Sequence, residues 1–126
     1  MTGRKRVLIV DDATLVRAYY RQALERAGYE VDEAMNGVEG LEKVLMQSFD
    51  LAIVDVNMPQ MDGMTFIRTL RGKELPTSAI PTLVTSTKAA EKDVAAARVA
   101  GANYYLTKPI SQERLIEHVA LMCGAA

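Results

Sequence analysis

Residues 7–12 read VLIVDD, four branched aliphatic residues followed by two aspartates. Three later runs have the same form: residues 51–55 read LAIVD, residues 83–85 read LVT, and residues 104–108 read YYLTK. Such apolar runs, separated by helical patterns, are typical of parallel strands buried on both faces. The carboxyl ends of parallel strands share one edge of a sheet, where open α/β sheets bind ligands. We therefore expect one cluster at that edge, made of Asp11, Asp12, Asp55, Thr85 and Lys108.

Between these runs, apolar residues recur with the spacing of amphipathic helices. The first expected helix follows Asp12, ends at Gly28, and has an apolar face of Leu15, Val16, Tyr19, Ala23 and Leu24. Residues 29–34 alternate and contain acidic residues, which an edge strand tolerates. The pattern predicts an α/β fold with a doubly wound five-stranded parallel sheet in the order 2-1-3-4-5, of the flavodoxin-like type.

Composition limits the possible functions. A chain of 126 residues with 49% hydrophobic content is long enough to form one compact domain, which we expect to span residues 1–126. The 15 basic and 16 acidic residues give no strong field, so neither nucleic acid nor membrane is expected as a partner. The single cysteine cannot form an internal disulfide, and we find no signal peptide or membrane-length apolar stretch. These features favour a cytoplasmic protein.

Crowded carboxylates raise one another's pKa unless a cation is present. Magnesium prefers oxygen ligands and is usually held by one or two carboxylates. Asp12, Asp55 and a backbone carbonyl from the following loop would suit it. A carboxylate beside a metal can attack phosphorus and form an aspartyl phosphate. Lys108 could then balance the phosphoryl charge, and the hydroxyl of Thr85 could donate a hydrogen bond to it.

At this point the residues resemble a known family, the receiver domains of bacterial two-component response regulators, and among them the stand-alone, CheY-like kind. The resemblance covers essentially the entire chain. It rests on the acidic pair at 11–12, on residues 55–63, which read DVNMPQMDG, on Thr85 followed by Ser86, and on Tyr105 three residues before Lys108-Pro109.

The resemblance implies a role for each matching residue. Asp55 would accept a phosphoryl group from the phosphohistidine of a sensor histidine kinase or phosphotransfer protein. Mg²⁺ would be bound directly by Asp12, by Asp55 and by the main-chain carbonyl of Asn57, with Asp11 acting through a metal-bound water. Lys108 would contact the phosphoryl group, and its bond to Pro109 is expected to be cis. The chain would be a signalling receiver that promotes its own phosphorylation and dephosphorylation, not an enzyme acting on other substrates.

We expect the phosphorylated site to act as a switch. Thr85 would move toward the phosphoryl group, and Tyr105 would turn from an exposed to a buried rotamer. Tyr105 could instead simply cover the sheet edge. The movement would bias the alanine-rich helix expected over 89–100, together with the last strand and last helix. Since no output segment follows, we expect a complete protein, a monomer or weak phosphorylation-dependent dimer, that signals by binding a downstream protein.

Other interpretations have specific weaknesses. A phosphatase of the haloacid dehalogenase class needs a second aspartate two residues after the nucleophile, where this chain has Asn57. A flavin or nucleotide module would need a glycine-rich loop after the first strand, where the acidic pair stands instead. A receiver cut from a longer regulator remains open. The chain departs from the family's pattern at Ile110, where many relatives carry phenylalanine. By the same resemblance, Asn57 and Thr87 occupy positions that in this family tune the lifetime of the acyl phosphate.

Overall fold

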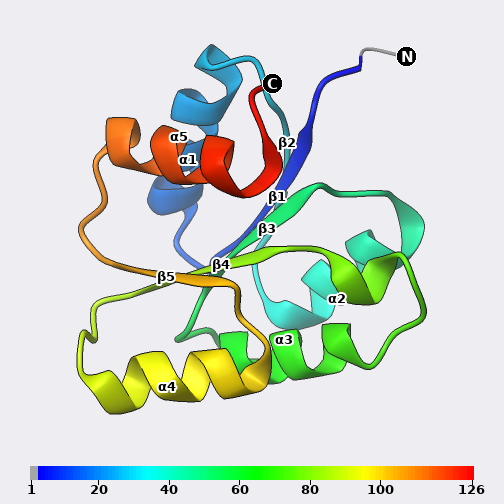
Figure 1. Cartoon of the computed structure of the whole chain (residues 1–126), viewed down its shortest axis with the longest axis vertical. Coiled ribbons are helices and arrows are strands. Elements are labelled where there is room, and N and C mark those ends of the chain that lie inside the picture. Colours follow the sequence, from blue (N-terminus) through cyan, green and yellow to red (C-terminus); the bar gives the residue numbers. More distant parts are fainter. Residues whose placement is uncertain (1–2) are drawn as a thin grey trace.

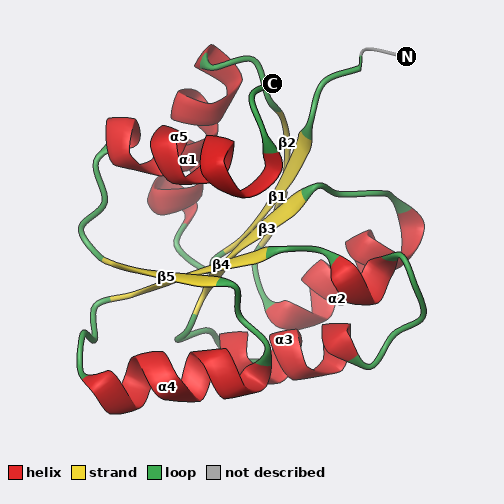
Figure 2. Ribbon diagram, in the orientation of Figure 1, coloured by secondary structure: helices red, strands yellow, loops and turns green. Residues whose placement is uncertain are grey.

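A computed structural model describes residues 3–126 of the chain. Its five strands all pair in parallel in the order β2-β1-β3-β4-β5, as the sequence predicts. Figures 1 and 2 show this sheet crossing the centre of the molecule. The strands are β1 (Arg6–Val10), β2 (Glu30–Ala34), β3 (Leu51–Asp55), β4 (Thr82–Ser86) and β5 (Tyr104–Thr107).

Helices cover both faces of the sheet, which makes it doubly wound. In Figure 1, α1 and α5 lie on one side of the sheet and α2, α3 and α4 lie on the other. Their bounds are α1 (Thr14–Arg26), α2 (Gly37–Met46), α3 (Gly63–Arg71), α4 (Glu91–Ala100) and α5 (Gln112–Cys123), with a short 3₁₀ turn η1 (Thr77–Ala79) before β4. The direction of winding reverses between β1 and β3. The carboxyl ends of these two strands are where open α/β sheets place their binding crevice.

Side-chain caps fix the start of several helices. Asn36 begins α2 by accepting from the backbone N–H of Glu39 at 2.8 Å, and Ser111 begins α5 in the same way. By contrast, α4 starts after Ala90, which offers no side-chain cap, and the helix begins two residues later than the expected 89. Its other end is defined by Gly101 at φ +115°, a conformation that favours glycine.

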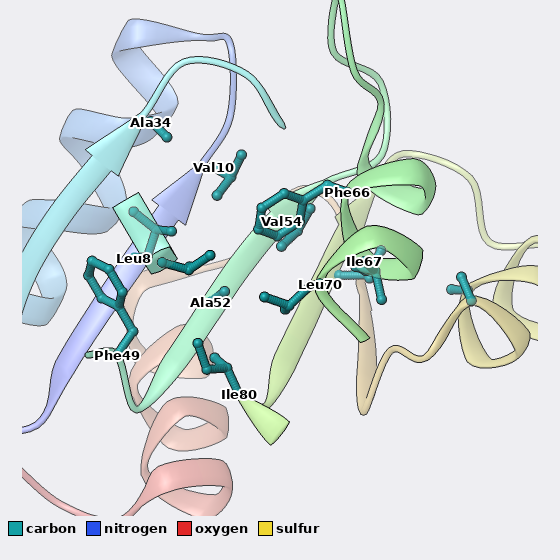
Figure 3. Close-up of a cluster of buried hydrophobic side chains, with 14 residues drawn as sticks. Leu8, Val10, Ala34, Phe49, Ala52, Val54, Phe66, Ile67, Leu70 and Ile80 are labelled. Carbon is teal, nitrogen blue, oxygen red and sulfur yellow. The ribbon is translucent and has the colours of Figure 1, made fainter. Parts of the chain in front are cut away.

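The core consists of two layers, one on each face of the sheet. The layer toward α2, α3 and α4 is drawn in Figure 3, where Phe66 from α3 lies over Val54. The layer toward α1 and α5 contains the alternate residues of the same strands, including Ile9 and Ile53. Because side chains alternate along a strand, the three central strands are buried on both faces. Asp11, Asp55 and Thr85 are therefore carried by strands that are packed on both sides.

The buried face of α1 matches the expected one only in part. Leu15 is 84% exposed and Tyr19 is 43% exposed, so these two residues do not belong to the core. The expected Ala23 and Leu24 are fully buried and Val16 packs half-buried against the core, whereas Arg17 and Tyr20 are buried in addition. The apolar spacing is compatible with both faces. The inward position of Arg17 is possible because its guanidinium donates to the buried carbonyl of Asp11 and to the half-buried carboxylate of Glu33.

Gly63 supplies a stability test for the loop that carries the site. A Cβ at this position would lie 2.3 Å from the carbonyl oxygen of Asp55, which is backbone and cannot yield easily. We expect Gly63→Ala to lower the free energy of unfolding by about 3 kcal/mol or more, measured by urea denaturation. The control is Gly72→Ala, where the nearest atom is 3.5 Å away, and it should change stability by about 0.5 kcal/mol or less. Equal effects would contradict this account of the loop.

Candidate functional site

Backbone hydrogen bonds bring the predicted site residues to one edge of the sheet. The N–H of Asp11, directly after β1, donates to the carbonyl of Ala34 at 3.1 Å. Asp55 is the last residue of β3 and lies opposite Thr85 of β4. The N–H of Lys108, directly after β5, donates to the carbonyl of Ser86 at 2.7 Å. The expected convergence at the carboxyl edge is therefore present in the fold.

Three carboxylates meet in this crevice. Asp11, Asp12 and Asp55 each offer an oxygen, and these oxygens lie within 4.8 Å of one another. Asp11 and Asp55 are buried, whereas Asp12 is exposed. Asp11 uses one oxygen to accept from the N–H of Ala13 at 2.9 Å and directs the other at Lys108. Such a set of oxygen donors is of the kind that Mg²⁺ selects.

Lys108 places a cation against two of these acids. Its Nζ lies 2.9 Å from Oδ1 of Asp55 and 3.3 Å from Oδ2 of Asp11. The peptide bond between Lys108 and Pro109 is cis, as expected. One ammonium facing three carboxylates leaves the crevice with a formal excess of negative charge. A further cation would therefore be attracted to it.

The charges in the crevice shift the pKa values of its members. Burial is the largest influence on the pKa of Asp55 and raises it, and the neighbouring charges of Asp11 and Asp12 act in the same direction. The hydrogen bond from Lys108 opposes this effect without reversing it. Burial alone would lower the pKa of Lys108, but the two buried acids outweigh it and the pKa is raised. The charged form of the Lys108 ammonium is therefore favoured, whereas the ionised form of the Asp55 carboxylate is disfavoured.

Thr85 contributes a buried hydroxyl next to the acids. Its Oγ1 has no hydrogen-bond partner among the described residues. Tyr20 of α1 lies nearby, and burial raises the pKa of this tyrosine, but its hydroxyl does not form a hydrogen bond of ordinary geometry with Thr85. A buried hydroxyl without a partner is costly and uncommon. Thr85 is thus a free donor one strand away from Asp55.

The residues that follow Thr85 in the chain are hydrogen-bonded to Tyr105. The hydroxyl of Tyr105 donates to the carbonyl of Lys88 at 2.7 Å, and the N–H of Lys88 donates to Oγ of Ser86 at 3.1 Å. The ring of Tyr105 is half-buried against the core. Tyr105 therefore holds the loop that follows Thr85 while also covering the sheet.

The remaining positions singled out in the sequence lie around the crevice. Asn57 is exposed in the loop between β3 and α3, and Thr87 is exposed after β4. Ile110 is buried and packs in the layer toward α5 in the place expected for an aromatic residue. In the described part of the chain, no helix has the length and apolar character needed to span a membrane.

Two residues near the crevice were missed in the sequence. Arg17 is 9% exposed and donates from Nη1 to the carbonyl of Asp11 at 2.6 Å. Tyr20, also on α1, lines a pocket together with Lys108. The available signal was their spacing with Leu24, since residues four and seven positions apart share one face of a helix. That signal competed with a more apolar stripe through Leu15 and Tyr19.

Comparisons with known proteins agree with this geometry. Residues 7–120 match the model of the response regulator receiver domain. Over 120 residues the chain is 35% identical to Protein PilH of Pseudomonas aeruginosa, covering 94% of this chain and 98% of PilH. It is 34% identical to Transcriptional regulatory protein ResD of Bacillus subtilis over 99% of its own length, but spans only 50% of ResD.

Among solved structures, the chain is similar to chemotaxis protein CheY4 of Vibrio cholerae. The TM-score is 0.89 at 32% sequence identity, and the match covers 95% of this chain and 99% of CheY4. The fold, the acidic crevice and the match across nearly all strands and helices lead to one conclusion. The chain belongs to the response regulator receiver domain family of two-component signalling proteins.

Proposed function

We propose that this receiver domain is a phosphorylation switch that accepts a phosphoryl group on Asp55 and signals by binding a protein partner. The donor would be the phosphohistidine of a sensor histidine kinase or phosphotransfer protein. The observation that carries the proposal is the position of Asp55, buried beside two other acids, paired with Lys108 at 2.9 Å and opposite the unpartnered hydroxyl of Thr85.

The chemistry of the acids supports a magnesium site. Asp12 and Asp55 would bind the ion directly, together with the main-chain carbonyl of Asn57. Both oxygens of Asp11 already have partners, the N–H of Ala13 and Lys108, which favours contact through a water. When bound, Mg²⁺ would neutralise the acids and the phosphoryl oxygens.

The transfer step follows from the placement of the side chains. An oxygen of Asp55 forms a bond to phosphorus as the bond from phosphorus to the donor's imidazole nitrogen breaks. The imidazole leaves with the electron pair of that bond and takes up a proton. Lys108 would remain close enough to balance the added charge, and the hydroxyl of Thr85 would donate to a phosphoryl oxygen. Hydrolysis by water returns the free carboxylate.

The contacts after β4 support a path from Thr85 to the surface. Movement of Thr85 toward the phosphoryl group would displace Ser86 and Lys88, and thereby break the hydrogen bond that Tyr105 donates. The neighbouring α4 buries few side chains, chiefly Ala97 and Ala100, so its position is easily biased. Phosphorylation would shift a two-state equilibrium of the α4-β5-α5 face, where a downstream protein would bind.

The same proposal includes the organisation and location of the protein. Residues 1–126 would form one receiver domain, in the cytoplasm, as a monomer or as a dimer that forms weakly on phosphorylation. Neither nucleic acid nor membrane is proposed as a direct partner.

The central test is phosphorylation by a small donor. On incubation with Mg²⁺ and acetyl phosphate, intact mass spectrometry should detect one added phosphoryl group, labile to base, on the parent chain. Asp55→Asn should gain none. Asp32→Asn, the same chemical change at an acid outside the crevice that pairs with Lys43, should be modified normally. Lys108→Met should react roughly 100-fold more slowly. Modification of Asp55→Asn, or sustained turnover of a phosphoester, would contradict the proposal.

Thr85 should separate chemistry from signalling. Thr85→Ala keeps Asp55 and Lys108, so it should still accept the phosphoryl group, but without a hydroxyl it should not pass the change to Tyr105. In NMR spectra recorded with Mg²⁺ and acetyl phosphate, resonances of Lys88 and Tyr105 should shift in the parent and in Thr85→Ser, and should stay near their unphosphorylated positions in Thr85→Ala. Identical shifts in all three proteins would exclude this path.

Two isosteric changes should have opposite effects on stability without Mg²⁺. The pKa of Asp55 is raised in the folded state, so its ionised form disfavours folding at neutral pH, and Asp55→Asn should be more stable than the parent. For Asp32, burial raises the pKa but the hydrogen bond from Lys43 leads the effects that lower it overall. Asp32→Asn should therefore be less stable at neutral pH.

The pH and metal dependence of these differences check the assignment. The advantage of Asp55→Asn should shrink as the pH falls to about 3.8, the ordinary pKa, because the parent carboxyl then becomes neutral. The deficit of Asp32→Asn should be lost only at lower pH, through the lowered pKa of the folded state. Saturating Mg²⁺ should stabilise the parent, by roughly 2.7 kcal/mol at 100 times its dissociation constant. Urea melts in which Mg²⁺ stabilises Asp55→Asn equally would contradict the site.

A further inference from the structure

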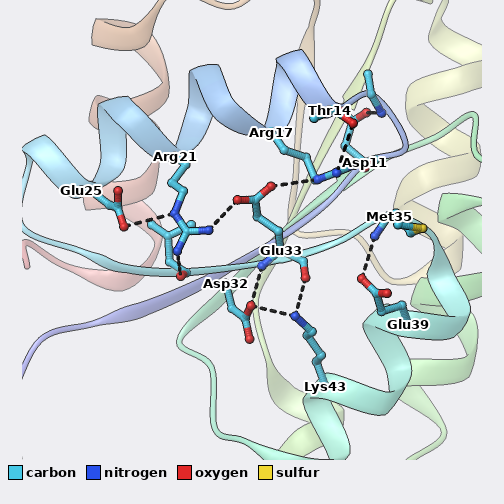
Figure 4. A network of polar contacts seen from close by, with 12 residues as sticks. Asp11, Thr14, Arg17, Arg21, Glu25, Asp32, Glu33, Met35, Glu39 and Lys43 are labelled. Atoms are coloured by element: carbon cyan, nitrogen blue, oxygen red, sulfur yellow. Dashed lines mark hydrogen bonds and ion pairs between the residues drawn. The ribbon is translucent and has the colours of Figure 1, made fainter.

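A buried arginine lies directly behind the acidic pair. Arg17, in the first turn of α1, points away from solvent with only 9% exposure. Nη1 donates to the main-chain carbonyl of Asp11 at 2.6 Å, and Nε donates to Oε1 of Glu33 on β2 at 2.9 Å. Figure 4 shows Arg17 reaching from α1 to both partners at once. A charged residue is rarely this buried unless it is paired.

The charge of Arg17 is balanced on the side away from the crevice. Glu33 also accepts a hydrogen bond from Arg21, and a neighbouring acid, Asp32, pairs with Lys43 of α2 at 2.7 Å. Although burial tends to raise the pKa of Glu33, the hydrogen bonds from Arg21 and Arg17 lower it overall, so this carboxylate stays ionised. Arg17 and Glu33 thus form a pair with little net charge. The main influence of Arg17 on the crevice is therefore the hydrogen bond that it donates to the carbonyl of Asp11, which fixes the orientation of that carbonyl.

This hydrogen bond restrains the loop that joins β1 to α1. The N–H of Asp11 is tied to the carbonyl of Ala34, and its Oδ1 accepts from the N–H of Ala13. The carbonyl of Asp11 belongs to the peptide unit that begins Asp12, so Arg17 fixes the plane from which the exposed carboxylate of Asp12 projects. The planar guanidinium can satisfy two acceptors at set angles, which a lysine ammonium cannot reproduce.

We propose that Arg17 is a positioning residue for the metal site: it fixes the Asp11–Asp12 peptide so that Asp12 and Asp55 are arranged to share one divalent cation. The inference rests on the magnesium site of the proposed function. Groups that orient metal ligands without touching the metal typically account for 10- to 100-fold in affinity. Arg17 acts through the carbonyl of Asp11 and contacts neither the metal nor the phosphoryl group.

Loss of Arg17 should weaken the binding of Mg²⁺, whereas charge repulsion alone would make its loss strengthen binding. Removing a positive charge near a cation site should tighten Mg²⁺ binding if repulsion were the main influence of Arg17. If orientation is the main influence, Arg17→Met should raise the dissociation constant of Mg²⁺ roughly 10-fold. Arg17→Lys, which keeps the charge but loses the fork of donors, should weaken binding by a smaller factor.

The experiment measures Mg²⁺ binding to the full chain by isothermal titration calorimetry. Arg21→Met is the matched control, because Arg21 lies on the same helix and pairs with the same Glu33 but makes no contact with Asp11. It should bind Mg²⁺ within about twofold of the parent. A second measurement, the rate of phosphorylation by acetyl phosphate against Mg²⁺ concentration, should show that Arg17→Met needs more Mg²⁺ but approaches the parent rate at saturation.

Each outcome decides the inference. Unchanged or tighter binding in Arg17→Met, or equal weakening in Arg17→Met and Arg21→Met, would overturn the role of Arg17 and leave the proposed function intact. Failure of the parent chain to bind Mg²⁺ would remove both. If circular dichroism shows that Arg17→Met is unfolded, Arg17→Lys decides: weaker binding that saturating Mg²⁺ overcomes supports the inference, and parental affinity contradicts it.

Discussion

Repulsion among three carboxylates at one end of the sheet is the constraint on which the site depends. Asp55 is buried beside Asp11 and close to Asp12, and its pKa is raised by burial first and by these neighbours next. Lys108 offsets only part of that charge. The crevice therefore keeps an excess of negative charge that a divalent cation would neutralise. Lys108 would in turn balance the charge of a phosphoryl group on Asp55. A phosphorylation switch requires both of these interactions.

The polar contacts that hold the surrounding loops and helices differ between the two sides of this crevice. On the side of β1 and β2, Arg17, Arg21 and Lys43 join α1, β2 and α2 in one network of ion pairs (Figure 4). On the side of β4 and β5, the loop leading to α4 is held by the hydroxyls of Ser86 and Tyr105. We interpret the first side as a fixed frame for the acids and the second as the part that moves.

The sheet order and the meeting of the site residues could be predicted from the sequence because both follow from topology. Buried parallel strands leave continuous apolar runs, and whatever follows those runs shares one edge. The cis bond before Pro109 was expected only through the family resemblance. The cis bond before Pro76 was not expected, since nothing in the local sequence distinguishes it.

The details that escaped prediction depend on side-chain direction and on backbone acceptors. The rotation of α1 decides whether Leu15 or Arg17 faces inward, and two overlapping stripes made that choice ambiguous. The acceptors for Arg17 and Tyr105 are main-chain carbonyls, of Asp11 and Lys88, which every residue possesses and which therefore leave no mark in the sequence. Their contribution could be seen only once the elements were assembled.

The most direct test of the shared site is a crystal structure of the chain grown with Mg²⁺ and a phosphoryl analogue such as fluoroberyllate. We expect one ion at about 2.1 Å from oxygens of Asp12, Asp55 and the Asn57 carbonyl. We also expect the analogue on Asp55, within hydrogen-bonding reach of Lys108 and Thr85. An ion bound elsewhere, or Asp12 turned away from Asp55 with the crevice occupied only by water, would contradict the shared site.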